Sequence, residues 1–247
     1  VALGRKVNLG YFPLSVDFAE KLYAGGIIKG SRWVKRDGRP TDASILRGRV
    51  IDRTMRPLFP DGITHEVQVI STVFSYDGEN EPDMIALVSA GLALQISDIP
   101  FDGPIAGMRL GLGEGGEFLI NPTRSQIESN DLDLIVSASK TSIVMVEAGA
   151  KEVAEDVMIE ALLHAQEEGA KVCEQIESIA AEIGKAKVEL VEAIDPEVAS
   201  KKQALVESLA STYKKEINDM VNKQGRLEAF GLEELITKIL GEDSVKL

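Results

Sequence analysis

Residues 27–60 read IIKGSRWVKRDGRPTDASILRGRVIDRTMRPLFP, and the rest of the chain is organised around this stretch. It holds nine basic and three acidic residues, a local balance of +6 in a chain of 247 residues whose net charge is −13. A cationic segment on an acidic body produces a localised field and little non-specific binding. The stretch also contains the only tryptophan, Trp33, beside Lys35 and Arg36. An aromatic face next to cations can stack a nucleic-acid base while the cations hold a phosphate.

The stretch divides into a loop and a helix. Residues 30–40 are rich in glycine, proline and charge, which is typical of an exposed loop. Thr41 then predicts a helix cap, and Asp42 adds a favourable negative charge in the first turn. The helix is expected to run to about Met55, because Pro57 cannot continue it.

The predicted helix carries three arginines on one face. Arg49, Arg53 and Arg56 have the spacing i, i+4, i+7, which makes them candidates for an anion or RNA contact. The apolar residues expected to face the core are Ile45, Leu46, Val50 and Ile51. The alternative is a solvated loop followed by a helix whose arginines pair with acidic residues elsewhere, and the charge pattern alone slightly favours this alternative.

The composition is that of a globular protein, with ample length for one large domain or two modest ones. No apolar run approaches the length of a membrane span, so we expect no membrane association. The single cysteine, Cys173, permits no internal disulfide and suits a reducing compartment, so the expected location is the cytoplasm. Because the chain opens on Val1 instead of methionine, we expect a fragment of a longer protein.

Alternation and periodicity predict the other elements. Strands are expected over residues 11–16 and Glu66–Phe74, and a helix that is apolar on nearly all sides over Asp83–Ile96. Further along, we expect two hairpins, a long helix and a helical tail that begins at Asp195-Pro196. These later elements are the pairs 105–112 with 117–121 and 132–139 with 142–147, then helices over 150–184, 195–223 and 227–240.

Two local patterns carry no chemistry. Gly111, Gly113 and Gly116 have the dinucleotide-binding spacing, but the residues that follow them indicate a strand instead of a helix. A hairpin turn is therefore the preferred interpretation. The two histidines, His65 and His164, are isolated from each other and from the one cysteine, so no metal cluster or nucleophile–base pair is predicted.

Five segments carry a family resemblance: GYFPLSVDFAEKLYAGG (10–26), GSRWVKRDGRP (30–40), SILRGRVIDRTMRPLFP (44–60), EVQVISTVFS (66–75) and IPFDGPIAG (99–107). Taken together they resemble the polynucleotide phosphorylase family, namely its first RNase PH-like domain and the helical domain that follows. The RPLFP and IPFDGPIAG segments are quite specific to the first half of that family. The resemblance runs through essentially the whole chain, in order.

The resemblance implies an α+β fold. A mixed β-sheet domain of the RNase PH-like kind, with packed helices, is expected over residues 1–185, and its opening strands are expected to precede Val1. A small all-α domain is expected over residues 186–247.

The resemblance also implies an activity. Members of the family are phosphorolytic 3′-to-5′ exoribonucleases (polyribonucleotide nucleotidyltransferases) of mRNA degradation. They shorten single-stranded RNA with inorganic phosphate as co-substrate and release nucleoside diphosphates. Three chains are expected to form a homotrimeric ring around the RNA, with other RNA-degradation proteins as further partners. The phosphate- and Mg²⁺-binding residues are expected in a second RNase PH-like domain outside this sequence. This chain alone is therefore expected to be inactive, with no catalytic residue or metal ligand of its own.

The basic loop has a counterpart in the family, which typically reads Phe-Phe-Arg-Arg before Gly-Arg-Pro. Aligned on Gly38-Arg39-Pro40, the matching positions here are Trp33, Val34, Lys35 and Arg36. Stacking is kept at Trp33 and lost at Val34, and lysine lacks the guanidinium fork. We expect the RNA contact to survive in weaker or altered form. The residues predicted to bind RNA are Arg32, Trp33, Lys35, Arg36 and Arg39, with Arg49, Arg53 and Arg56 as candidates for a further anion or RNA contact.

Two rival functions stay open. The chain could be a catalytically silent RNA-binding or scaffold protein. It could also be a small independent phosphorolytic nuclease that holds phosphate through Arg49, Arg53 or Arg56. Against the second rival, no set of carboxylates can be placed beside those arginines from the sequence.

Overall fold

The computed structural model describes residues 1–7, 10–27, 39–113 and 115–190 in one compact unit, Val1–Glu192. In a second unit, Ala193–Leu247, it describes residues 204, 206–208 and 210–214, most of which are helical. Those positions lie inside the helix predicted over 195–223. The helix predicted over 227–240 lies outside the described residues.

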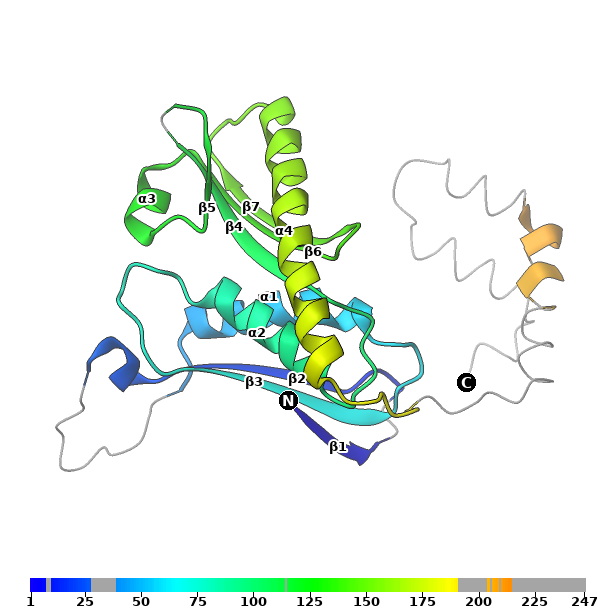
Figure 1. Ribbon diagram of the computed structural model, residues 1–247. Helices are drawn as coiled ribbons and strands as arrows, with labels where there is room; N and C mark the ends of the chain where they lie inside the picture. The colour runs from blue at the N-terminus through cyan, green and yellow to red at the C-terminus, as the bar shows by residue number, and fades with distance from the viewer. Residues whose placement is uncertain are drawn as a thin grey trace. The chain divides into compact units, whose positions relative to one another are not determined.

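The first sheet has three strands in the order β1-β3-β2 (Figure 1). β1 (Ala2–Lys6) runs antiparallel to β3 (His65–Val73), and β2 (Leu14–Glu20) runs parallel to β3. A parallel pair needs a crossover connection, which α1 (Asp42–Met55) provides. The basic stretch, residues 27–60, therefore belongs to the crossover between β2 and β3 and includes α1 itself. The crossover also contains two short 3₁₀ helices: η1 (Leu22–Gly25) follows β2, and η2 (Arg56–Leu58) follows α1.

The second sheet is antiparallel, with four strands in the order β5-β4-β6-β7. Its strands are β4 (Ala106–Leu112), β5 (Phe118–Ile120), β6 (Leu132–Ala138) and β7 (Ile143–Ala150). Both hairpins predicted from the sequence are confirmed. The glycine-rich segment between β4 and β5 is a turn, closed by the Gly113 N–H, which donates to the Glu117 carbonyl at 2.9 Å. Gly116 has φ 83°, a conformation that favours glycine in such a turn.

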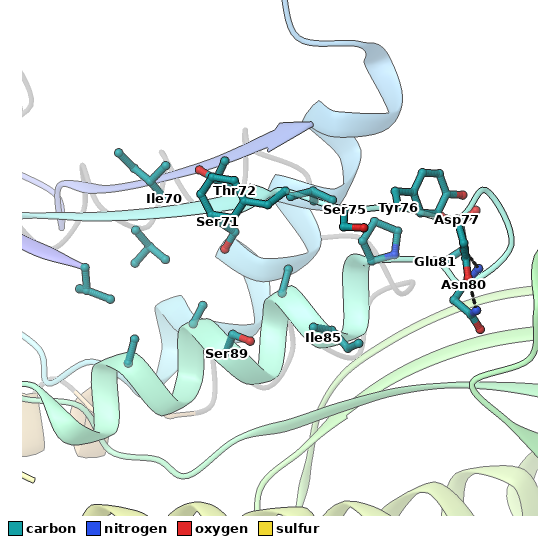
Figure 2. A pocket seen from close by; sticks show the side chains of 18 residues that line it. Ile70, Ser71, Thr72, Ser75, Tyr76, Asp77, Asn80, Glu81, Ile85 and Ser89 are labelled. Atoms are coloured by element: carbon teal, nitrogen blue, oxygen red, sulfur yellow. Dashed lines mark hydrogen bonds between the residues drawn. The ribbon is translucent and has the colours of Figure 1, made fainter. Parts of the chain in front are cut away.

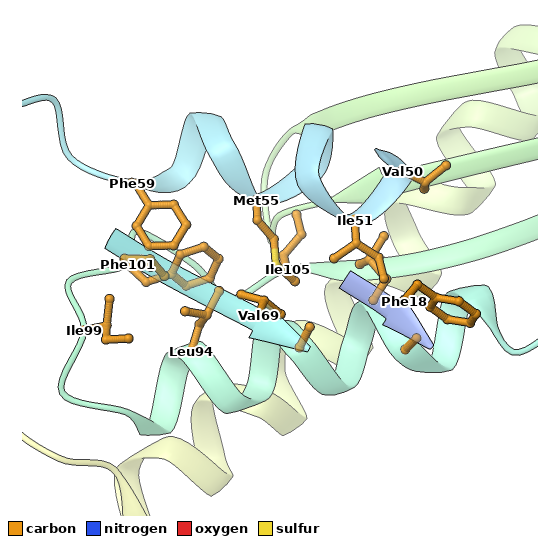
Figure 3. Packing of buried hydrophobic residues seen from close by; sticks show 14 of the residues in the cluster. Phe18, Val50, Ile51, Met55, Phe59, Val69, Leu94, Ile99, Phe101 and Ile105 are labelled. Carbon is orange, nitrogen blue, oxygen red and sulfur yellow. The ribbon is translucent and has the colours of Figure 1, made fainter. Parts of the chain in front are cut away.

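Two cores hold the layers together. The first lies between the two sheets, where α1 and α2 (Asp83–Ile96) pack (Figures 1 and 3). Its fully buried side chains include Ile51, Met55, Leu87, Leu94 and Ile105. The second core lies between the second sheet and α4 (Glu155–Ile183), where Leu110, Leu134 and Ala165 are buried. The arrangement is an α+β fold, as predicted.

β3 has one uncovered edge. β2 pairs with it from Val67 to Val73, but β1 pairs with it no further than Gln68. No strand of the described residues pairs with the far side of the segment Val69–Val73. The side chains of β3 alternate, so that Val67, Val69 and Val73 are buried while Ile70 is exposed.

Several details of the sequence predictions were wrong. Ile45 and Leu46 do not face the core, because they are 51% and 61% exposed, whereas Val50 and Ile51 are buried. The strand expected over residues 11–16 is β2, which begins at Leu14 and continues to Glu20. The long helix begins five residues later than expected because β7 runs to Ala150. The short helix α3 (Arg124–Ser129) was not predicted, although its capping box, Thr123 with Gln126, is visible in the sequence.

Candidate nucleic-acid interface

A groove with a volume of about 650 Å³ lies between β2 and the amino-terminal half of α1. One wall is the strand, from Val16 to Glu20, and the other is the helix, from Thr41 to Asp52. Arg39, which precedes the helix, and Arg49, which lies within it, also line the groove. The helix wall of the groove therefore belongs to the basic stretch, residues 27–60.

Of the five residues predicted to bind RNA through the loop, the structure describes Arg39. It is exposed and lies at the groove. The other four, Arg32, Trp33, Lys35 and Arg36, lie outside the described residues.

The three helix arginines do not act together. Arg49 is exposed in the groove and forms no ion pair with any residue in the described part of the chain. Arg53 donates to Glu147 on β7. Arg56 donates to Asp52 at 2.6 Å and to the main-chain carbonyls of Phe12 and Leu14, so it holds α1 against the strand β2. Of these three arginines, Arg49 is therefore the one placed to contact a ligand in the groove.

Local sequence explains how α1 comes to form this wall. Thr41 caps the helix, and its Oγ1 accepts the Ser44 N–H at 3.1 Å, as the sequence predicted. Gly48 brings the helix close to the strand, because a Cβ added there would lie 3.5 Å from the Val16 carbonyl oxygen. Alanine at position 48 would fit at ordinary van der Waals distance, whereas a longer side chain would need α1 to move away from β2.

The acidic residues of the groove are mostly engaged. Glu20 pairs with Arg47, and Asp52 pairs with Arg56. Asp17 accepts a weak hydrogen bond from the Gln68 side-chain amide, at 3.4 Å. Asp52 is thus neutralised by Arg56, whereas Glu20 shares the single charge of Arg47 with Glu81. The cations in the groove lining are Lys21, Arg39 and Arg49, and they face the carboxylate of Asp17 and the partly compensated carboxylate of Glu20.

Arg47 was missed as a structural centre of this region. Its guanidinium donates to Glu20 at the end of β2 and to Glu81 in the segment before α2. These partners are 27 and 34 residues away in the chain, so no local spacing in the sequence pointed to them. Only the crossover topology brings the three side chains together.

A second ionic cluster lies on another part of the same unit. Arg109 on β4 donates to Asp133 on β6 at 2.6 and 2.7 Å and lies 3.4 Å from the buried Asp83 on α2. Burial raises the pKa of the Asp83 carboxyl despite the nearby guanidinium. The hydrogen bond to Asp133 raises the pKa of Arg109, which therefore stays charged. This cluster joins α2 to the second sheet.

An apolar groove of about 550 Å³ follows the uncovered edge of β3 (Figure 2). Ile70 of β3 and Ile85 of α2 lie along it and are exposed, and the polar residues Asp77, Asn80 and Glu81 gather at one end. Hydrogen bonds from the backbone of Asn80 and Glu79 lower the pKa of Asp77 to about 2, so its carboxylate fixes this turn at neutral pH. Among the described residues predicted to contact RNA, which are Arg39, Arg49, Arg53 and Arg56, none lines this groove.

Two further searches bear on function. Within the described ranges, no group of three or more histidine, cysteine, aspartate or glutamate side chains could hold a metal ion. The described side chains therefore do not fit the expected Mg²⁺. No helix in the part of the chain that the structure describes is both long and apolar enough to cross a membrane.

Family comparisons match most of the first unit. The model described as 3′ exoribonuclease family, domain 1, matches residues 2–100, and that described as domain 2 matches residues 103–168. The first match contains the sheet β1-β3-β2 with α1 and α2, and the second contains the four-stranded sheet and the start of α4. The rice (Oryza sativa) protein Rrp46 is similar in structure, with a TM-score of 0.58 over 73% of this chain and 80% of that chain. At 10% identity this likeness shows the fold alone.

Sequence relatives agree with these matches. The polyribonucleotide nucleotidyltransferase of Halalkalibacterium halodurans is 52% identical over 180 residues, which are 73% of this chain and 25% of that protein. The enzyme of the same name from Exiguobacterium sibiricum is 49% identical over 187 residues, again 25% of its length. The chain thus spans about a quarter of the length of the curated relatives it matches. Two family models and these identities lead to one conclusion: the chain belongs to the 3′ exoribonuclease family, and it is similar to the polyribonucleotide nucleotidyltransferases within it.

Proposed function

We propose that this chain is the RNA-gripping part of a phosphorolytic 3′-to-5′ exoribonuclease of the polyribonucleotide nucleotidyltransferase kind. The complete enzyme would transfer the terminal nucleotide of single-stranded RNA to inorganic phosphate and release a nucleoside diphosphate. Transfer and the binding of phosphate and Mg²⁺ would occur on a second RNase PH-like domain. In a homotrimeric ring, working in the cytoplasm with other RNA-degradation proteins, this part would hold the RNA in place.

The observation that carries the proposal is the groove between β2 and α1. Arg39 and Arg49 line it, and Arg39 follows the basic residues Arg32, Lys35 and Arg36 and the aromatic Trp33 in the sequence. Contacts from arginine and lysine to phosphates supply affinity that is independent of base sequence and falls with salt. Stacking on an aromatic ring adds about 1–3 kcal/mol per base and tolerates any base. An enzyme that shortens RNA of any sequence needs a grip of this kind.

Such a grip would contribute to catalysis by holding the scissile phosphate of the RNA in the correct position. A scissile phosphate that is misplaced by a small distance loses much of the advantage of a bound, oriented reactant. The ion pairs of Arg53 and Arg56 support placing the chemistry elsewhere, because they leave no cluster of arginines to hold inorganic phosphate on α1. They weigh against an independent nuclease built on this helix.

The central test is phosphate-dependent release of nucleoside diphosphates from poly(A) by the 247-residue chain in the presence of Mg²⁺. We expect RNA binding without release. Robust release would overturn the assignment of the chemistry to another domain. Absence of RNA binding would overturn the gripping role.

The loop residues are tested by the double variant Lys35→Ala with Arg36→Ala. We expect weaker binding of single-stranded RNA and a salt slope smaller by about 1.4, since each lost phosphate contact removes about 0.7 from the slope. Binding that is unchanged at every salt concentration would exclude these two residues from the grip.

A catalytically silent RNA-binding or scaffold protein is the second candidate. It shares the groove of Arg39 and Arg49 with the first candidate and differs from it in having no catalytic role. A fusion protein separates the two candidates. In it, this chain is joined to the part of a relative that follows the matched residues, and phosphorolysis is measured. Phosphorolysis by the joined protein, abolished when the groove arginines are replaced, would support the enzyme; wild-type rates in those variants would favour the scaffold.

A further inference from the structure

The two walls of the groove are joined by a partly buried cluster of charged and polar side chains. Glu20 stands on β2, and Ser44 and Arg47 stand on α1. Arg47 donates to the Glu20 carboxylate, and the Ser44 hydroxyl donates to its other oxygen at 3.2 Å. The second branch of the Arg47 guanidinium donates to Glu81. One carboxylate on the strand thus holds two successive turns of the helix.

The Arg47 side chain is enclosed on several sides. The side chains of Arg47, Glu20 and Glu81 are only 18%, 26% and 12% exposed. The Arg47 guanidinium carbon also lies 5.9 Å from the centre of the buried Phe18 ring, close enough for a cation–π contact. A planar guanidinium with two carboxylate partners has few other orientations available, so the cluster is a stiff connection.

The cluster continues into the helix cap. The Thr41 hydroxyl donates to the Ser44 hydroxyl at 3.1 Å while its oxygen accepts the Ser44 N–H. A continuous series of hydrogen bonds therefore runs from the cap, two residues after Arg39, through Ser44 to Glu20 on the opposite wall. Arg49 lies half a turn beyond Arg47 on the same helix. The cluster therefore links the helix wall that carries Arg49 to the strand wall of the groove.

We propose that Glu20 is a positioning residue for RNA binding: by joining β2 to Ser44 and Arg47 it fixes the width of the groove that Arg39 and Arg49 line. The inference rests on the proposed function and deepens it. The ligand is the phosphodiester backbone of single-stranded RNA, held between two arginines whose spacing the carboxylate sets. Arg47 itself is neutralised by its partners and acts only through the geometry.

The sign of a mutational effect separates this role from simple electrostatics. Glu20 lines the groove, so a purely electrostatic view predicts that removing its negative charge strengthens RNA binding. The positioning role predicts the opposite, because the loss of the ion pair frees the helix wall. Asp17 is the matched control: it is a carboxylate on the same strand and in the same groove, but it has no ion pair in the described part of the chain.

The experiment measures the affinity of the 247-residue chain for a fluorescein-labelled oligo(A) by anisotropy, between about 50 and 200 mM salt. For Glu20→Gln we expect binding about 5-fold weaker at about 100 mM salt and a slope smaller by about 0.7, as for one lost phosphate contact. For Asp17→Asn we expect binding that is about 2-fold tighter, from one repulsive charge removed at a distance of several ångströms in water. Unchanged or tighter binding by Glu20→Gln overturns the inference.

Ser44→Ala keeps every charge and removes only one hydrogen bond to Glu20, so it tests the geometry without an electrostatic change. We expect about 2-fold weaker binding, and it serves as the deciding variant if Glu20→Gln does not fold, as judged by circular dichroism and thermal unfolding. Binding equal to that of the wild type would then overturn the inference. If the wild-type chain itself fails to bind oligo(A), the proposed function falls and the positioning role falls with it. If the wild type binds and Glu20→Gln binds as tightly, only the positioning role falls.

Discussion

Replacing Arg49 should weaken RNA binding, whereas replacing Arg53, four residues further along the same helix, should not. The two side chains have the same chemistry and similar places in the sequence pattern, but different surroundings. Arg49 lies in the groove without an ion pair in the described part of the chain, and Arg53 is paired with Glu147. Arg49→Gln therefore removes a charge that can meet a phosphate, and Arg53→Gln removes one that is already neutralised.

The size of the effect follows from counterion release. One phosphate contact to single-stranded RNA contributes about 0.7 to the slope of log affinity against log salt. At about 0.1 M salt this corresponds to about 0.7 decades, which is roughly a 5-fold loss of affinity or about 1 kcal/mol. For Arg53→Gln we expect no change in the slope. Its ion pair with Glu147 joins side chains that are 54% and 47% exposed, so its loss should lower the free energy of unfolding by less than about 1 kcal/mol.

The assay is fluorescence anisotropy with labelled oligo(A) at several salt concentrations, with urea unfolding of each variant as the stability control. Arg49→Lys is the matched conservative variant and should keep the slope, because the charge remains. Equal losses of affinity in Arg49→Gln and Arg53→Gln, or a larger loss in the second, would refute the reasoning.

Other predictions concern the cores and the buried ionisable groups. Gly91→Ala should lower the free energy of unfolding, measured by urea titration, by up to about 2 kcal/mol. The new Cβ would lie 2.6 Å from a methyl of Ile105, and this overpacking would outweigh the gain in helix propensity. Gly169→Ala, whose nearest contact would be 3.3 Å, should be close to neutral in the same titration. Burial raises the pKa of Cys173 to about 11, so at pH 8 only about one thiol in a thousand is ionised, and Ellman's reagent should react with it only in denaturant. Burial also raises the pKa of Asp83, so this group stabilises the fold at low pH and that contribution is lost as the pH rises through its folded pKa. As the pH rises above about 4, the wild type should lose this stability while Asp83→Asn keeps its own, so the free energy of unfolding of the variant should rise relative to that of the wild type. A difference that stays constant with pH would contradict this.

Local signals predicted the secondary structure well. The cap at Thr41 and the proline at position 57 bracketed α1, and the apolar run Asp83–Ile96 matched α2 to the residue. The errors arose where burial depends on a partner that the sequence does not name. Ile45 and Leu46 belong to the apolar set of α1, but β2 and α2 pack against the side that carries Val50 and Ile51.

The site was harder to predict for the same reason. Charge and aromatic content located the basic stretch, but helical spacing placed Arg49, Arg53 and Arg56 in one group. The tertiary fold determines the partners of Arg53 and Arg56. Arg53 pairs with a residue of β7, and Arg56 donates to main-chain carbonyls just before and within β2. The Arg47 cluster joins residues from three separate segments, and no pattern within any one of them indicates it.

The uncovered edge of β3 has a consequence for the solubility of the isolated chain. Between Val69 and Val73, alternate peptide groups point away from β2 and have no strand partner among the described residues, beside an apolar surface that includes Ile70 and Ile85. Such an edge is a template with which a strand of another molecule can pair, and the fraction of paired molecules rises with protein concentration without any unfolding. Self-association, more than thermal denaturation, should therefore set the upper limit on the concentration at which this chain can be kept. A lysine at position 70, on the outward face, would raise that limit without disturbing the inward-facing valines.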